Sequence, residues 1–155
     1  MRVDKQALRK QALLLADGGG KNMAAALVSK FQLSRQSVNR HLTQLVEDGD
    51  LVPAGLTKAR TYHLAVKQEA SRSFPREGLS EDVAWRTACA PVIKDLPENV
   101  RDIWHYAMTE MINNAIDHSG SPDVQVAIRK TALYTLGWVV DAGEGIFLKI
   151  QRALD

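Results

Sequence analysis

The sequence predicts an α+β protein made of two modules, and three observations lead to this expectation. Residues 1–66 contain three stretches with helical spacing of apolar residues, then two short apolar runs around a glycine-containing turn. Residues 97–141 contain one long helical pattern followed by two runs in which apolar and polar residues alternate. Residues 1–66 carry ten Lys and Arg against five Asp and Glu, whereas residues 67–155 carry ten against thirteen. A basic front and an acidic back indicate modules with different partners.

The composition excludes several classes of protein. The chain has 155 residues, 45% hydrophobic and 25% charged, which is typical of globular domains. It contains no run of about 18 apolar residues that would predict a membrane-spanning helix, and its first ten residues lack the apolar core of a signal peptide. Cys89 is the single cysteine, so neither an internal disulfide nor a multi-cysteine zinc site is predicted. We expect a cytoplasmic protein with no membrane partner.

Three helices are expected in the front module. The first covers residues 4–16 and ends at a turn with three glycines, and the second covers residues 23–31. Ser34 is a good N-cap for the third helix, residues 35–48, because its hydroxyl can accept a hydrogen bond from an unpaired amide. Four apolar residues form the buried stripe of that helix: Val38, Leu42, Leu45 and Val46.

The two short apolar runs around Gly55 predict a β-hairpin behind the third helix. Three helices followed by a hairpin form the winged helix-turn-helix plan. The stretch LSRQSVNRHLTQLVEDGDL, together with the hairpin, resembles bacterial winged-helix regulators over about residues 22–65. The resemblance implies a winged helix-turn-helix domain over residues 1–66.

A winged helix of this kind places its third helix in the major groove of double-stranded DNA. The resemblance therefore implies contacts to base edges or phosphates from the polar side of that helix. Lys58 and Arg60 on the hairpin would contact the DNA backbone. The alternative is that the polar side is only solvated, or that the domain binds a protein. The residues of the third helix concerned are Arg35, Gln36, Asn39 and Arg40.

Residues 67–80 are polar and without periodicity, and we expect a linker. Ser80 then caps a short helix whose first turn is acidic, which suits the helix dipole. Pro91 is expected to break or bend this element. Cys89 lies in an apolar stretch, so a buried thiol is expected rather than a reactive one.

A strong helix begins at Pro97 and keeps its apolar period to about Ser119. At about 100° per residue, Glu110, Asn114 and Asp117 fall within an arc of about 60° beside the apolar stripe. Such polar groups suit the edge of a pocket. The alternating runs 123–129 and 133–140 then predict an antiparallel hairpin.

Two motifs in this module resemble a known superfamily. TEMINNAIDHS, residues 109–119, is similar to the N box of the GHKL ATPases, and DAGEGI, residues 141–146, is similar to their first glycine box. That superfamily joins gyrase, heat-shock chaperones, mismatch-repair proteins and histidine-kinase catalytic domains. The resemblance implies a two-layer α/β sandwich of the histidine-kinase-like ATPase type over residues 81–155, with ATP and Mg²⁺ as cofactors.

The resemblance also implies roles for individual residues. Glu110 matches the acid that orients and deprotonates the attacking water, and Asn114 matches the magnesium ligand. Asp141 matches the carboxylate that accepts the adenine amino proton. Glycines in the second motif let the backbone approach the nucleotide without a Cβ clash. The remaining candidates for nucleotide binding are Asn113, Asp117, Gly143 and Gly145.

No second glycine box follows Gly145, although the superfamily needs one to hold the triphosphate. We therefore expect the sandwich to be partial and the chain to be a piece of a longer protein. On its own it is expected to be inactive as an ATPase or protein kinase.

The preferred interpretation is a prokaryotic transcription regulator that couples ATP binding to DNA binding. One alternative is an ATP-dependent protein kinase of the anti-sigma-factor type, acting on a protein partner. Another is a non-catalytic module that only dimerises, as a homodimer. No phosphoacceptor-histidine segment is present, which disfavours an autophosphorylating histidine kinase.

Overall fold

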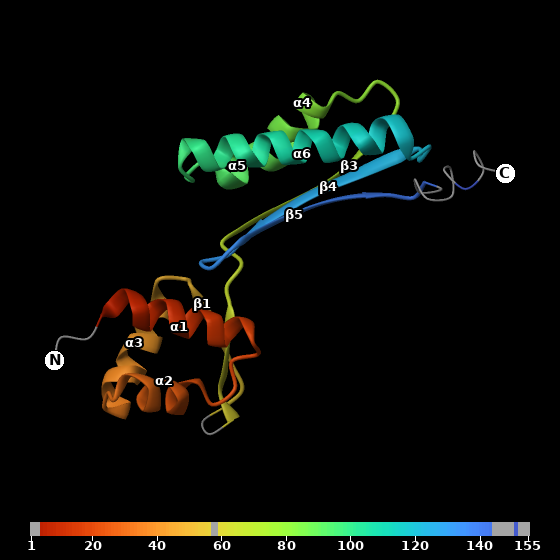
Figure 1. Ribbon diagram of the computed structural model, residues 1–155. Coiled ribbons are helices and arrows are strands. Elements are labelled where there is room, and N and C mark those ends of the chain that lie inside the picture. The colour runs from red at the N-terminus through yellow and green to blue at the C-terminus, as the bar shows by residue number, and fades with distance from the viewer. Residues whose placement is uncertain (1–3, 57–58, 144–150, 152–155) are drawn as a thin grey trace. The chain divides into compact units, whose positions relative to one another are not determined.

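The computed structural model of the chain describes residues 4–56, 59–143 and 151. It confirms the α+β class, with helices and two small antiparallel sheets (Figure 1). The chain forms two compact units. Unit 1 consists of residues 1–67 and 131–134, and unit 2 consists of residues 68–130 and 135–155. Among the described residues, no helix has the length and apolar character needed to cross a membrane.

Unit 1 contains three helices and a two-stranded sheet, as the periodicity predicts. The helices are α1 (Lys5–Asp17), α2 (Met23–Phe31) and α3 (Arg35–Glu47). Strands β1 (Leu51–Ala54) and β2 (Thr61–Leu64) pair antiparallel. One side of each helix faces a common core, whose fully buried residues include Leu13, Leu27, Val38, Leu42 and Leu51.

Capping side chains explain where two of these helices begin. Asp4 accepts hydrogen bonds from the amides of Gln6 and Ala7 at the start of α1. The Ser34 hydroxyl accepts one from the Ser37 amide, 3.2 Å away, which confirms the predicted N-cap of α3. Both side chains satisfy amides that have no partner within the helix.

The glycine turn after α1 is a packed element of unit 1. Gly20 has a φ of +64°, and a Cβ atom added there would lie 1.8 Å from the carbonyl oxygen of Tyr62 in β2. Only glycine allows this close approach of the two backbones. Gly20 therefore serves packing in unit 1.

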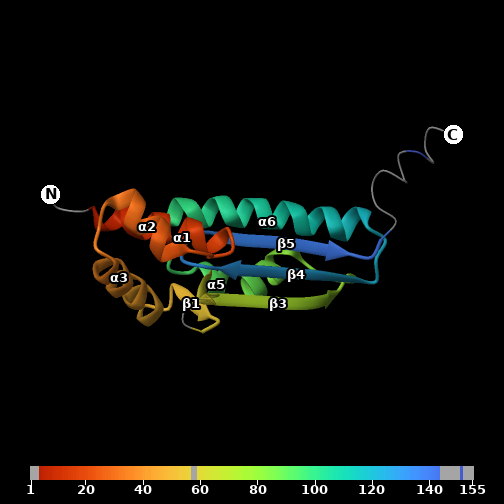
Figure 2. The ribbon, with the colours of Figure 1, turned by 90° about the horizontal axis from the view of Figure 1, so that it is seen from below.

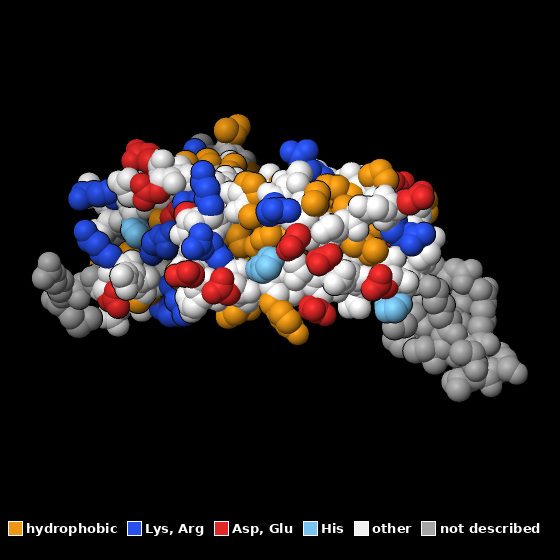
Figure 3. Space-filling view, turned by 90° about the horizontal axis from the view of Figure 1, so that it is seen from above, with side chains coloured by type: hydrophobic (Ala, Val, Ile, Leu, Met, Phe, Trp, Pro, Cys, Tyr) orange, Lys and Arg blue, Asp and Glu red, His pale blue; other side chains and the backbone are white. Residues whose placement is uncertain are grey.

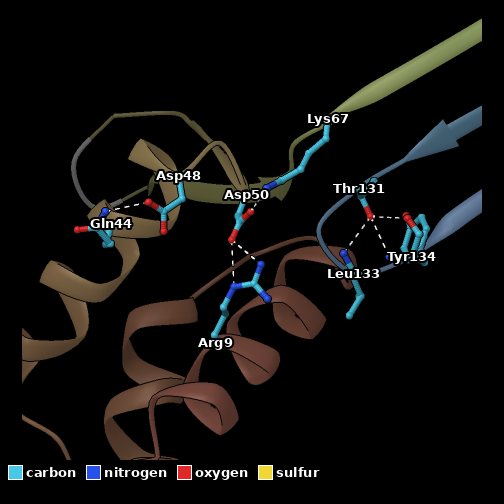
Figure 4. A network of polar contacts seen from close by, with 8 residues as sticks. All are labelled: Arg9, Gln44, Asp48, Asp50, Lys67, Thr131, Leu133 and Tyr134. Atoms are coloured by element: carbon cyan, nitrogen blue, oxygen red, sulfur yellow. Dashed lines mark hydrogen bonds and ion pairs between the residues drawn. The ribbon is translucent and has the colours of Figure 1, made fainter. Parts of the chain in front are cut away.

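A buried carboxylate joins three segments of unit 1 (Figure 4). Asp50, just after α3, receives hydrogen bonds at Oδ2 from Nε and Nη2 of Arg9 in α1, at 3.1 and 2.8 Å. Lys67 Nζ lies 2.5 Å from Oδ1 of the same carboxylate. Burial alone would raise the pKa of Asp50, but the hydrogen bonds from Lys67 and Arg9 outweigh it and lower the pKa.

The turn formed by residues 131–134 belongs to unit 1, although it connects two strands of unit 2. Thr131 Oγ1 accepts hydrogen bonds from the amides of Leu133 and Tyr134, which orders the turn (Figure 4). Leu133 packs against the core of unit 1. The Tyr134 hydroxyl donates to Oδ1 of Asp17 at 3.0 Å.

Unit 2 is a three-stranded antiparallel sheet covered on one face by helices (Figures 1 and 2). Its strands, in the order β3-β4-β5, are β3 (Gln68–Pro75), β4 (Asp123–Lys130) and β5 (Thr135–Asp141). The covering helices are α4 (Glu81–Ala84), a π-helical turn (Trp85–Cys89), α5 (Ala90–Ile93) and α6 (Glu98–His118). The buried residues between the layers include Ile93, Met108, Ile112, Val124, Val126 and Ile128.

The prediction of a linker over residues 67–80 is wrong for residues 68–75, which form β3 and pair with β4 along its whole length. The strand was missed because most of its residues are polar. Ala70 and Phe74 face the core, whereas Glu69, Ser71 and Ser73 are exposed. A strand that buries so little apolar area shows only a weak alternation. The second strand of the predicted hairpin also begins later, at Thr135 rather than Leu133.

Pro91 disturbs the helical segment that contains it, as expected. The five residues before Ala90 form a π-helical turn, in which the Ala90 amide donates to the carbonyl of Trp85. Proline has no amide hydrogen and crowds the preceding turn, so a widened turn before it accommodates the ring. Cys89 in this turn is fully buried, and burial raises the pKa of its thiol to about 11. The burial confirms the expectation of a buried thiol.

Candidate functional site

The C-terminal half of α6 and the end of β5 face each other across an open cavity of about 400 Å³. Helix α6 presents Asn114 and His118, one turn apart, and β5 presents Asp141 at its last position. The structure therefore brings together residues 114 and 141, which the sequence singles out in two separate motifs. The complete lining is Met111, Asn114, Ala115, His118, Ser119, Val139 and Asp141.

The segment after β5 is held in a tight turn against the end of α6. Oδ1 of Asp141 accepts a hydrogen bond from the Gly143 amide at 3.0 Å. A Cβ atom added at Gly143 would lie 1.8 Å from the carbonyl oxygen of Ser119, so a side chain would separate the two segments. The glycine at 143 is thus required by backbone packing beside the cavity.

Three other predicted residues do not line this cavity. Glu110 is exposed and lies one turn before Asn114 on α6, and Asp117 is exposed as well. Asn113 is half-buried. Gly145 lies outside the described residues. Figure 3 shows acidic side chains spread over the face of the molecule that carries α6.

The described residues contain no cluster of three or more His, Cys, Asp or Glu side chains that could hold a metal ion by themselves. A hard cation at this cavity would need oxygen ligands beyond the amide oxygen of Asn114, which water or a bound phosphate can supply. Magnesium commonly binds in this way, through a few protein oxygens plus substrate phosphates.

The apolar walls of the cavity were not among the predicted residues, although the helical period indicates most of them. Met111 and His118 are three residues before and four residues after Asn114, so all three lie on the same side of α6. Val139 lies two residues before Asp141 and shares its side of β5. These apolar surfaces can pack against a flat ring while the polar groups fix its orientation.

Unit 1 has its own concave surface, of about 310 Å³. Arg35 and Asn39 from α3 and Arg60 beside β2 line it together, as three of the predicted contact residues. The start of α2 completes it, a feature with no signal in the sequence. Its full lining is Asn22, Met23, Ala24, Ala25, Arg35, Asn39, Thr43, Arg60 and Tyr62.

The remaining predicted contact residues lie elsewhere. Arg40 is exposed and lines a different hollow, together with Lys5 and His41. Gln36 is exposed on α3 and lines neither hollow. Lys58 lies outside the described residues. Arg35, Gln36, Asn39 and Arg40 are nevertheless all solvent-accessible on the side of α3 away from the core.

Both surfaces combine exposed polar side chains with a concave shape, which suits ligand binding. Comparison of the chain with protein-family models, curated proteins and solved structures gives no match.

Proposed function

We propose that this chain is a prokaryotic cytoplasmic transcription regulator in which unit 1 is a winged helix that binds double-stranded DNA and unit 2 is a GHKL-type domain that binds ATP with Mg²⁺. The observation that carries the proposal is the cavity shared by Asn114 and Asp141. These two residues stand 27 positions apart and belong to the two motifs that resemble the N box and the first glycine box.

The chemistry of the cavity fits an adenine nucleotide. A carboxylate accepts several hydrogen bonds, so Asp141 can bind the adenine amino group while it keeps the bond from Gly143. Met111 and Val139 supply apolar surface for the ring. Asn114 would hold Mg²⁺ together with the phosphates, and the ion would neutralise phosphate charge. Glu110, one turn earlier on α6, is the proposed base for an attacking water.

The chemistry of unit 1 fits a nucleic-acid backbone. Arg35 and Arg60 are cations on one concave surface, and Asn39 adds a side-chain amide to the same surface. Cations of this kind bind phosphates, and an asparagine can bond an adenine edge. Gln36 and Arg40 extend the polar side of α3.

The course of the chain supports coupling between the two ligands. The backbone passes between the units after residues 67, 130 and 134. Strand β5 starts directly after the turn whose Leu133 packs in the core of unit 1, and it ends at Asp141 in the proposed nucleotide site. A change in the position of β5 on nucleotide binding would therefore act on residues that stabilise the winged helix.

The nucleotide site is tested by Asp141→Asn, measured by calorimetric titration with Mg-ATP. We expect about 10-fold to 100-fold weaker binding, because a charge-assisted hydrogen bond contributes about 1.5–3 kcal/mol. Asp102→Asn is the matched control, since this exposed aspartate of α6 lies away from the cavity. Equal ATP affinity of the parent and the Asp141 variant would show that adenine is not bound there.

The DNA surface is tested by Arg35→Ala and Arg60→Ala, with duplex binding followed over a salt series. Loss of one phosphate contact should weaken binding to all sequences and lower the salt slope by about one. Arg72→Ala, which removes an exposed arginine of unit 2, serves as control. Affinity and slope that stay at parent values in both test variants would rule out this surface.

A further inference from the structure

Arg76 and Ser121 connect the two segments that border the cavity of unit 2. Arg76 follows β3 directly, and its backbone amide donates to the carbonyl of Pro122 at 2.8 Å. Its guanidinium donates from Nε to the carbonyl of Ser121, at 2.8 Å, and from Nη1 to the carbonyl of Ile116, at 3.2 Å. The Ile116 carbonyl is one of the last four of α6, which have no partner within the helix. Arg76 thus places a cation at the C-terminal end of α6, where the helix dipole favours it.

Ser121 carries the connection on to β5. Its side chain is almost fully buried, and its hydroxyl donates to the carbonyl of Asp123 at 2.6 Å. The same oxygen accepts a hydrogen bond from the Ala142 amide at 3.2 Å. The Ser121 amide in turn donates to Oγ of Ser119 at 3.1 Å. Ser121 therefore links the backbone between Asp141 and Gly143 to the start of β4 through its hydroxyl, and to Ser119, the C-cap of α6, through its amide.

We infer that Arg76 and Ser121 are positioning residues of the nucleotide site: they set the separation between the Asn114 turn of α6 and the Asp141 carboxylate. The inference rests on the function proposed above. Neither residue lines the cavity, so both act through the backbone that they hold. Because Asp141 would select adenine by its amino group, a shift of the Ala142 backbone changes the choice of base as well as the affinity.

The preference for ATP over GTP distinguishes a positioning role from an effect on stability alone. Guanine has a carbonyl oxygen where adenine has its amino group, so a correctly placed Asp141 favours ATP over GTP. Ser121→Ala removes the hydrogen bond to Ala142, and we expect roughly three- to tenfold weaker ATP binding. GTP binding should change less, so the preference for ATP falls. A purely structural role would weaken both nucleotides by the same factor.

The experiment measures Mg-ATP and Mg-GTP affinities of the full chain by titration, with thermal melting of each variant. Ser71→Ala is the matched control for Ser121→Ala, because Ser71 is exposed and its hydroxyl accepts an exposed hydrogen bond from Gln125. Arg76→Met is the second variant, because it removes the guanidinium and leaves an unbranched apolar side chain in place of the aliphatic stem. Its control is Arg129→Met, which removes an exposed ion pair with Glu69.

The inference is supported if Ser121→Ala and Arg76→Met both lose preference for ATP while their controls keep it. It is overturned if the preference stays at the parent value, or if both affinities fall by one common factor. If Ser121→Ala melts below the assay temperature, Arg76→Met decides by the same criteria. A parent chain that binds neither ATP nor GTP refutes nucleotide binding by the described cavity, the part of the proposed function on which the inference rests, and this outcome separates the two failures.

Discussion

At the scale of single residues, Asp50 is a buried charge that connects three segments of unit 1. Its side chain is only 3% exposed and is held by Arg9 and Lys67, which are both partly exposed. Because these partners lower the pKa of Asp50, its contribution to stability is complete above the unfolded pKa of about 3.9. That contribution is lost as the pH falls through the lowered pKa of the folded state.

The expected result is acid-sensitive folding of unit 1. Asp50→Asn should lower the free energy of unfolding near neutral pH by about 2 kcal/mol, the usual contribution of hydrogen bonds to charged groups. The loss should shrink as the pH falls below about 4. Urea unfolding over a pH series measures both effects. The control is Asp48→Asn, because Asp48 is exposed and accepts a hydrogen bond from Gln44. If both variants lose the same free energy of unfolding with the same pH dependence, the role given to Asp50 is wrong.

At the scale of elements, helix α3 depends on its N-cap. The Ser34 hydroxyl satisfies the Ser37 amide, so Ser34→Ala should destabilise unit 1 by about 1 kcal/mol. Ser29→Ala, at an exposed position inside α2, should instead be neutral or slightly stabilising because alanine is the better helix former. Thermal melting of both variants checks the opposite signs. If the Ser34 variant is as stable as the Ser29 variant, the Ser34 hydroxyl does not stabilise α3.

Elements with a clear apolar period could be predicted from the sequence, whereas an element that depends on pairing with residues far along the chain could not. Helix α6 and the β4–β5 pair follow their apolar periods. Strand β3 has no local signal because its partners in β4 lie about 50 to 60 residues away and its polar side is exposed. The same holds for Arg76, whose partners Ile116 and Ser121 are 40 and 45 residues away. No local pattern marks such contacts.

The candidate sites show the same limit. Asn114 and Asp141 were singled out by motif resemblance, and the structure places both at one cavity. The motif also drew attention to Glu110, which lies on the same helix but outside the cavity. In unit 1, Arg35 and Arg60 were predicted, but the contribution of the start of α2 was not. Its residue Asn22 adopts a left-handed backbone conformation, with a φ of 53°, which the sequence does not indicate.

At the scale of the whole molecule, the turn of residues 131–134 is the feature that gives the proposed coupling a physical route. Leu133 and Tyr134 stabilise unit 1, and the strand that follows them ends at Asp141. Two ligands that favour different positions of β5 must influence each other's affinity by the same factor. Tyr134→Phe, which removes the hydrogen bond to Asp17, should reduce that factor while each ligand still binds.

The most direct test of the proposed regulator is the affinity of the chain for duplex DNA with and without saturating Mg-ATP, together with the reciprocal titration. The account predicts that ATP shifts the DNA affinity by about fivefold or more, a typical coupling between sites. DNA should shift the ATP affinity by an equal factor, and Asp141→Asn should abolish the effect of ATP at the same nucleotide concentration. If both ligands bind tightly but the DNA affinity is the same with and without Mg-ATP, the proposed coupling is wrong.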